Sequence, residues 1–425
     1  MPCVRSVGRG FFPLDEELQL LPGGLTPHMH ESLVRLGAWV PFERAAELLG
    51  DLLSVQVSKS QSVRYTERAG EAYVALQTEE ADRIEKEAPL APVGAEKMVM
   101  GADGAMVPLR HGEWAEVKTL AIGEVTPSVK EGDEWVVHTR HLSYFSRLVE
   151  AERFEHLTLV EVQRRGMEHC RQVAMLGDGA DWVQSLANYH RPDAIRILDF
   201  PHAGQRIGEV GQVLWGEGRP QAKEWTTERL HQLKHEGPQQ ILAEFRTLQE
   251  QHPALEVLSE NLAYLEKREF QMQYPTFQQQ GWPIGSGMVE SANKLVVEAR
   301  LKGAGMHWER GHVDAMLGLR NIVCSDRWQE EWPRIAERLR QEARERRKQQ
   351  REKRRLAQCP VTQVMEVPPA AIPEPELESQ LEVSRHLEAV PPNKPSGPRK
   401  PAPNHPWRRM PFGRNLYQPS KSAKN

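Results

Sequence analysis

Two short apolar runs that each end in Asp-Gly restrict the folds open to this chain more than any other feature. Met98–Ala102 is followed by Asp103 and Val173–Gly177 by Asp178, in both cases with glycine next. Apolar runs of this length, bounded by turn residues, are typical of buried strands. Asp-Gly is also a common turn, so either position alone is more often structural than functional. The two together predict a sheet whose strands present carboxylates.

The apolar segments around these runs predict the order of the sheet. The first run restarts at Met106–Leu109, which indicates strand, turn and strand, and Trp114–Val125 predicts a third strand. Val136–Arg165 is helix-rich, and Ala194–Phe200 is a further strand after Val173–Gly177. This order favours an α/β fold with a ribonuclease H-like mixed sheet. In such a sheet the middle of the first strand lies beside the end of the fourth, so Asp103 and Asp178 would converge.

Two converging carboxylates repel each other, and a divalent cation relieves that repulsion. Mg²⁺ (or Mn²⁺) suits such a pair, because it prefers oxygen ligands and keeps positions open for phosphate. Two ions about 4 Å apart would activate a water or 3′-hydroxyl and stabilise the leaving oxygen. Glu290, near a helix start after the loop Ile284–Gly287, is the candidate third ligand. The alternative is a carboxylate that merely favours a helix N-terminus.

The rest of the chain is predicted to be largely helical, and its 425 residues suggest two or three folded units. Residues 25–94 resemble a helix-turn-helix-like DNA-binding module, in which Lys59 and Arg64 would contact DNA; a generic three-helix module is the alternative. Residues 206–280 form an all-α insertion between the core segments 95–205 and 281–335. Lys294, Arg300 and Lys302 on the last core helix are further candidates for phosphate contact, with a solvated helix face as the alternative.

Both ends of the chain differ from the core. Residues 1–24 resemble the remnant of a zinc ribbon, although Cys3 alone cannot close a zinc site. Residues 336–358 are predicted as a basic helix. Residues 359–425 are proline-rich and predicted to be a disordered basic tail, where Arg408 and Arg409 would contact DNA. The four cysteines are scattered, and no apolar stretch is long enough for a membrane span, so a cytoplasmic protein without membrane partners is expected.

Several motifs together resemble bacterial insertion-sequence DDE transposases of the ISKra type, in the Mutator-like superfamily. They are, in order, ADGAMVP (102–108), GDGADW (177–182), ILDFPHA (197–203), IGSGMVESANK (284–294), RLKGAGMHW (300–308) and HPWRR (405–409). The resemblance implies a catalytic triad of Asp103, Asp178 and Glu290. It also implies an accessory Asp-x-x-His motif, here Asp199 and His202.

The resemblance further implies that the chain binds double-stranded DNA, both terminal inverted repeats and target, as a homo-oligomer on paired ends in the nucleoid. The motif Asp199/His202 has a simple alternative, a satisfied hydrogen bond at a strand end. Two other functions stay open at this point. One is a nuclease on a ribonuclease H-like fold, and the other is a truncated or catalytically idle DNA-binding protein descended from a transposase.

Overall fold

The computed structural model describes residues 20–132 and 134–358. The chain divides into a unit over residues 1–345 and a second over 346–425, of which only the end of one helix is described. Most of the predicted ribbon remnant (1–24) and the whole proline-rich tail, with Arg408 and Arg409, lie outside the described residues.

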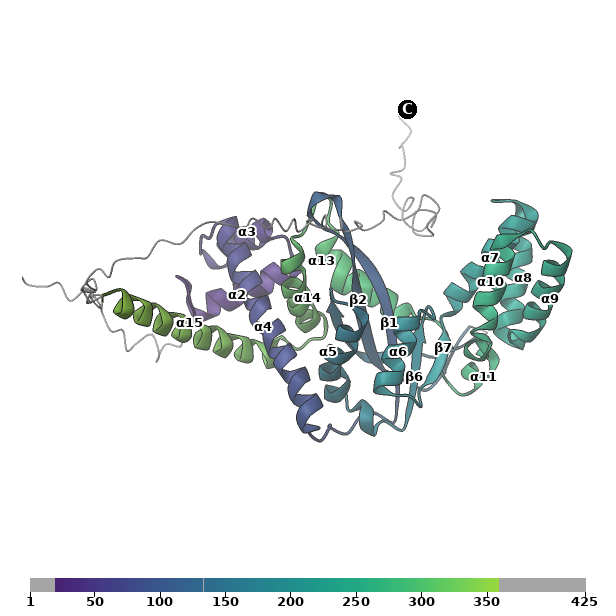
Figure 1. Ribbon diagram of the computed structural model, residues 1–425, viewed down its shortest axis with the longest axis horizontal. Helices are drawn as coiled ribbons and strands as arrows, with labels where there is room; N and C mark the ends of the chain where they lie inside the picture. Colours follow the sequence, from purple (N-terminus) through teal and green to yellow (C-terminus); the bar gives the residue numbers. More distant parts are fainter. Residues whose placement is uncertain (1–19, 133, 359–425) are drawn as a thin grey trace, which may run out of the picture. The chain divides into compact units, whose positions relative to one another are not determined.

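In the described part of the chain, five strands form one mixed sheet in the order β5-β2-β1-β6-β7 (Figure 1). Their bounds are β1 (Lys97–Pro108), β2 (Trp114–Val125), β5 (Thr139–Arg147), β6 (Gln172–Gly177) and β7 (Ile195–Leu198). β5, β2 and β1 pair antiparallel, whereas β1, β6 and β7 pair parallel. The predicted α/β class with a mixed sheet is therefore confirmed.

The predicted turn at Asp103-Gly104 is wrong. β1 continues through both residues, and Asp103 lies opposite Thr119 in the ladder with β2. That ladder runs unbroken from Met98 opposite Glu124 to Pro108 opposite Trp114, so long-range backbone pairing overrides the local turn preference of Asp-Gly.

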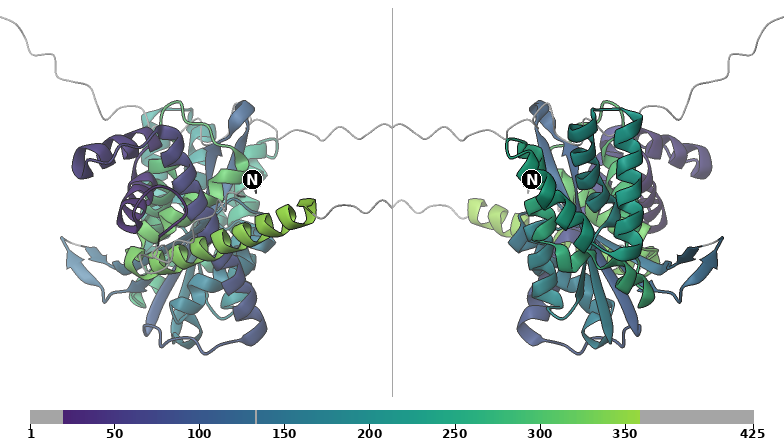
Figure 2. Two further views of the ribbon diagram at one scale, coloured as in Figure 1. Left: turned by 90° about the vertical axis from the view of Figure 1, so that its left-hand side faces the viewer. Right: turned by 90° about the vertical axis from the view of Figure 1, so that its right-hand side faces the viewer.

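The helix-rich prediction for Val136–Arg165 is wrong in its first part. β5 occupies Thr139–Arg147, and α5 (Ala151–Arg164) follows only after it. Because β2 offers a partner edge along this length, the segment pairs as an edge strand of the sheet. A separate hairpin of β3 (Val129–Glu131) and β4 (Glu134–Val136), which the sequence did not suggest, projects from the body of the protein in Figure 2.

Helices cover both faces of the sheet. One face packs against α5 and α6 (Asp181–His190), in a core that contains Met98, Met100 and Ala102 of β1. The other packs against α12 (Gly287–Ala292), the π-helical η4 (Asn293–Glu298), α13 (Ala299–Leu301) and α14 (Arg310–Cys324), with Val99 of β1 in that core. Because side chains alternate along a strand, Asp103 belongs to the second face.

The N-terminal helices are α2 (Pro27–Trp39), α3 (Phe42–Leu53) and α4 (Lys59–Glu87). Thr26-Pro27 is a sequence typical of a helix start, and the Thr26 side chain caps α2 while Pro27 opens it. The short polar and basic segment Ser58–Thr66 suggests a third helix, and α4 runs far beyond Thr66, to Glu87. These helices share a core with α14 and α15 (Trp328–Gln358), in which Leu33, Leu49 and Trp328 are buried.

The predicted helical insertion is present between β7 and α12. It consists of α7 (Phe200–Trp215), α8 (Pro220–Glu236), α9 (Gln239–Gln251), α10 (Glu256–Glu266) and α11 (Tyr274–Gln279), with the 3-10 turn η3 (Glu269–Met272) before α11. In Figure 1 these helices lie at the β7 edge of the sheet. The described helices include none that is long and apolar enough to cross a membrane.

Candidate active site at the ends of three parallel strands

Three aspartates lie at one level on adjacent strands. In the parallel ladders, Ala102 of β1 is opposite Gly177 of β6, and Gly177 is opposite Leu198 of β7. The next residue on each chain is an aspartate: Asp103, Asp178 and Asp199. Parallel strands in register carry consecutive residues at matching heights. Asp103 and Asp178 are therefore neighbours, as the sequence predicted, and Asp199 lies one strand further along.

Asp103 is held by two hydrogen bonds. The Gly104 amide donates to Oδ1 at 2.8 Å, and the Asn293 amide Nδ2 donates to Oδ2 at 2.9 Å. Burial raises the pKa of Asp103 to about 6; the charge of Asp178 adds to the rise, while both hydrogen bonds oppose it. A carboxyl in this state binds a proton or a cation readily near neutral pH.

Asn293 was not assigned a role from the sequence. It is buried at the start of η4, a π-helical segment, and such segments occur often at functional positions. Its Oδ1 is buried and has no hydrogen-bond partner in the described residues. The only signal in the sequence was its position three residues after Glu290, on the same side of a helix.

The Asp178 turn is held by the helical insertion. Arg268, which follows α10, donates from Nη2 at 2.6 Å and from Nε at 3.1 Å to the Gly179 carbonyl. The Tyr264 hydroxyl donates to the carbonyl of Asp178. Asp178 itself accepts from the Ala180 amide at 2.9 Å through Oδ1. Gly179 has a φ of +77°, a backbone conformation that favours glycine, so the turn depends on glycine at this position.

Asp199 and His202 are joined by a hydrogen bond at the start of α7. Asp199 is 1% exposed and accepts from His202 Nδ1 at 2.5 Å through Oδ2, while its Oδ1 accepts from the Ser286 amide. Burial disfavours the imidazolium form of His202. The hydrogen bond and charge of Asp199, with the charges of Asp178 and Asp103, outweigh burial and raise the pKa of His202. The imidazole therefore shares one electrostatic environment with all three aspartates.

The structure does not place the side chain of Glu290, a predicted site residue, beside Asp103 and Asp178. Its side chain is 65% exposed and pairs with Lys294 Nζ at 2.6 Å. No group of three or more His, Cys, Asp or Glu in the described part of the chain is arranged to hold a metal ion. Glu290 nevertheless stands on α12, the helix that packs on β1, three residues before the partner of Asp103.

The glycines that allow this helix to approach are not those of the Gly-Ser-Gly loop. Gly285 and Gly287 have no positive φ, and a Cβ on either would meet nothing within 4 Å. A Cβ on Gly101 of β1, in contrast, would come within 2.2 Å of Val289 Cγ2. The close approach of α12 to the sheet therefore depends on Gly101.

Residues 5–332 match a family described as an uncharacterised protein family, UPF0236. The chain belongs to this family. No curated protein matches the chain. The UPF0236 match includes the three aspartates, His202, Glu290 and Asn293.

The residues of this UPF0236 chain that were predicted to contact DNA differ from one another in the side chains that surround them. Lys59 is exposed and pairs with Glu43 at 3.1 Å, and Arg64 is exposed beside the Tyr65 ring. Lys302 pairs with Glu298 at 2.6 Å.

The prediction for Arg300 is wrong. Arg300 is 2% exposed, and its Nε donates to the Gly37 carbonyl at 3.0 Å. Its guanidinium also lies over Phe42 and Trp308, so burial lowers its pKa to about 10 and the group holds α2 and α13 together.

Proposed function

We propose that this UPF0236 protein is a DDE transposase of a bacterial insertion sequence, which cleaves DNA at the element ends and joins the freed 3′ ends to target DNA. The observation that carries the proposal is the placement of Asp103 and Asp178 side by side on adjacent parallel strands. The middle of β1 lies beside the end of β6, which supports a ribonuclease H-like sheet interrupted by α7–α11. On this interpretation α2–α4 form the DNA-binding module.

The donor set around Asp103 fits a hard divalent cation. Two carboxylates share one face of the sheet, and the buried Asn293 Oδ1 adds an amide oxygen with no partner in the described residues. Mg²⁺ and Mn²⁺ are bound by oxygen ligands of this kind. Asp103 and Asp178 would hold one or two such ions, and Glu290 would join them only after its side chain leaves Lys294. When bound, the ions supply activation of the attacking hydroxyl and stabilisation of the leaving oxygen.

The remaining residues would position this site. Asn293 fixes the Asp103 carboxylate, and Tyr264 with Arg268 fixes the backbone after Asp178. Asp199 orients His202 through Nδ1, so that in the imidazolium form Nε2 would donate to a phosphate oxygen. A protonated His202 would offset part of the negative charge that DNA phosphate brings to a site rich in carboxylates.

The partners that follow from this proposal are the terminal inverted repeats and target DNA, with a homo-oligomer on paired ends in the nucleoid. Arg64, Lys59, Lys294 and Lys302 are the described residues that we assign to phosphate contact. Each such contact would add to the salt dependence of binding.

A strand-transfer assay tests the proposal. Purified full-length protein is mixed with Mg²⁺ and duplexes that carry the inverted repeats flanking the gene. Joined products, absent for Asp103→Asn and Asp178→Asn, are the expected result. Cleavage without joining would instead assign the site to a nuclease.

One observation favours the second candidate, a transposase-derived DNA-binding protein that no longer cleaves. Glu290 is exposed and ion-paired with Lys294 instead of facing the aspartates. On that reading the protein binds inverted-repeat DNA, yields no cleaved strand at any Mg²⁺ or Mn²⁺ concentration, and binds equally well as Glu290→Gln.

A further inference from the structure

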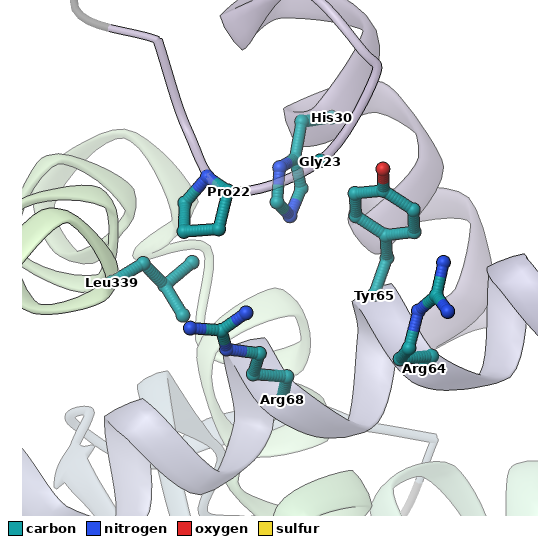
Figure 3. A pocket seen from close by; sticks show the side chains of 7 residues that line it. All are labelled: Pro22, Gly23, His30, Arg64, Tyr65, Arg68 and Leu339. Atoms are coloured by element: carbon teal, nitrogen blue, oxygen red, sulfur yellow. The ribbon is translucent and has the colours of Figure 1, made fainter. Parts of the chain in front are cut away.

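A cavity of about 300 Å³ lies in the N-terminal helical region, away from the three aspartates (Figure 3). It is bounded by α2, α4 and α15 and by the segment before α2. Its volume is at the lower end of the range typical of small-molecule sites, about 300 Å³ and upward. The lining combines two apolar side chains with an aromatic ring and three nitrogen-bearing groups: Pro22, Leu339, Tyr65, His30, Arg64 and Arg68.

His30 is the unusual member of this lining. Its side chain is 3% exposed, and neither ring nitrogen has a hydrogen-bond partner among the described residues. The ring packs edge-on against Tyr65, with centroids 4.6 Å apart, and lies 6.0 Å from the Trp332 ring. Burying a polar group without a partner is costly, so such groups are normally satisfied by protein, water or ligand. His30 therefore indicates an occupant that carries a hydrogen-bonding atom.

The charge around His30 defines that occupant. Figure 3 shows the guanidinium of Arg68 reaching into the space between Leu339 and Tyr65, and that of Arg64 beside the Tyr65 ring. Burial, and then the positive charge of Arg68, lower the pKa of His30 to about 4, so the ring is neutral at pH 7 and presents one N–H donor. The two arginine side chains, together with the N–H group of His30, are complementary to an anion that has several acceptor oxygens.

The part of the wall formed by Gly23 and Tyr65, beside His30, is fixed by close contact. Gly23 has a φ of +134°, and a Cβ there would come within 1.9 Å of the Tyr65 hydroxyl. That hydroxyl accepts a hydrogen bond from the Gly24 amide at 2.9 Å. The segment before α2 is thus held against α4, and the cavity is a formed feature of the fold.

We propose that this cavity binds a phosphate group, with His30 donating to one oxygen and Arg64 and Arg68 supplying the positive charge. Arginine and imidazole N–H groups are well suited to phosphate oxygens, and the apolar side chains of Pro22 and Leu339 leave room for the carbon group that carries the phosphate. The phosphate belongs either to the DNA backbone or to a free small molecule. The inference does not depend on cleavage at the aspartate site, since none of these residues lies there; it shares only Arg64 with the residues assigned above to DNA phosphate contact.

The test uses the full chain and inorganic phosphate. Thermal unfolding is measured in phosphate and in chloride at equal ionic strength, and the His30 imidazole signal, assigned with His30→Phe, is followed by NMR. Phosphate should raise the Tm, since a ligand that binds only the folded state stabilises it, and should shift the His30 signal. His30→Phe and Arg64→Gln should each weaken phosphate binding roughly tenfold or more. Exposed residues on the same helices, His28→Phe on α2 and Lys86→Gln on α4, serve as matched controls.

Arg64→Gln changes an exposed side chain, so the test stands even if His30→Phe fails to fold. An equal rise in Tm for wild type, His30→Phe and Arg64→Gln overturns the proposal. So does a His30 signal that responds to neither phosphate nor duplex DNA. Where duplex DNA displaces phosphate from His30, the site takes a backbone phosphate. Where phosphate shifts the signal and DNA does not compete, the ligand is a free phosphate or phosphate ester.

Discussion

Asn293 donates a hydrogen bond of 2.9 Å to Oδ2 of Asp103, a residue 190 positions earlier in the chain. The bond joins η4 to the middle of β1 and fixes a carboxylate that the proposed function uses for metal. Asn293→Ala should therefore raise the Mg²⁺ concentration for half-maximal DNA cleavage by roughly tenfold, as loss of a supporting partner of a metal ligand typically does. Ser291→Ala, on the exposed side of the same helix, should leave that concentration unchanged. An identical Mg²⁺ response in both variants would contradict the role given to Asn293.

The raised pKa of Asp103 predicts how stability depends on pH. The pKa of Asp103 is about 6 in the folded chain, and an ordinary aspartate in the unfolded chain has about 3.9. The folded state thus binds this proton more tightly, so the contribution of Asp103 to the free energy of unfolding falls as pH rises from about 4 to about 6 and is level above that. The loss is at most about 3 kcal/mol.

Asp103→Asn removes this titration and should raise the metal-free Tm at pH 7.5 relative to wild type. The check is the difference in Tm between pH 4.5 and pH 7.5, which should shrink in this variant. The exposed Asp181→Asn is the control, because Asp181 has a lowered pKa from its bond to Lys267 and cannot produce the same fall. A wild-type Tm that climbs between these two pH values in step with Asp103→Asn would refute the assignment.

The pKa of His202 affects stability in the same sense as that of Asp103, over a higher pH range. The pKa of His202 is raised, because the hydrogen bond and charge of Asp199 outweigh burial. The stabilisation is therefore complete below the unfolded pKa of about 6.5 and is lost as pH rises through the folded pKa. Asp199→Asn should bring the pKa of His202 down, measured by NMR titration of its ring, whereas Asp193→Asn should not. An unchanged titration of His202 in Asp199→Asn would remove the basis for its proposed charge.

The sequence predicted those parts of the fold that local residues determine. Trp114–Val125 forms β2 with the predicted bounds, and Thr26 caps the first N-terminal helix. Alternating or helical apolar patterns and capping residues act over a few positions, so one sequence reveals them. Asp103 and Asp178 were identified as neighbours because each follows a buried apolar run.

The features that were missed depend on partners far away in the chain. β1 passes through Asp103-Gly104 because β2 pairs with it along the whole length, and β5 is a strand because β2 offers an edge. Asn293 reaches Asp103 because its helix packs against β1, and Arg300 is buried because α2 lies beside α13. No local pattern contains such information, since tertiary pairing routinely overrides local preference.

Arg268 should influence DNA cleavage without touching DNA. The Arg268 guanidinium makes two hydrogen bonds to the Gly179 carbonyl, which hold the turn after Asp178. A lysine has a compact ammonium in place of the planar guanidinium and cannot make both bonds in the same geometry. Arg268→Lys should lower the cleavage rate roughly tenfold, because a small displacement of the Asp178 carboxylate slows the reaction, while DNA affinity stays unchanged. The rate is measured at saturating DNA, with Lys267→Gln as the exposed neighbour control. Equal rates for Arg268→Lys and wild type would show that the turn holds its shape unaided.

Gly101 and Gly285 separate two explanations of how α12 reaches the sheet. A Cβ at Gly101 would meet Val289 Cγ2 at 2.2 Å and Met288 Cε at 2.9 Å, whereas one at Gly285 would meet no atom within 4 Å. Gly101→Ala should therefore destabilise the fold by about 1–3 kcal/mol, the usual cost of overpacking a formed core, and displace Asn293 from Asp103. Gly285→Ala should leave the Tm close to that of wild type and slightly restrict the unfolded chain. Urea unfolding of both variants measures the difference, and cleavage activity should follow the Gly101 change. A larger loss of stability in Gly285→Ala than in Gly101→Ala would show that the close approach depends on the Gly285-Ser286-Gly287 loop instead.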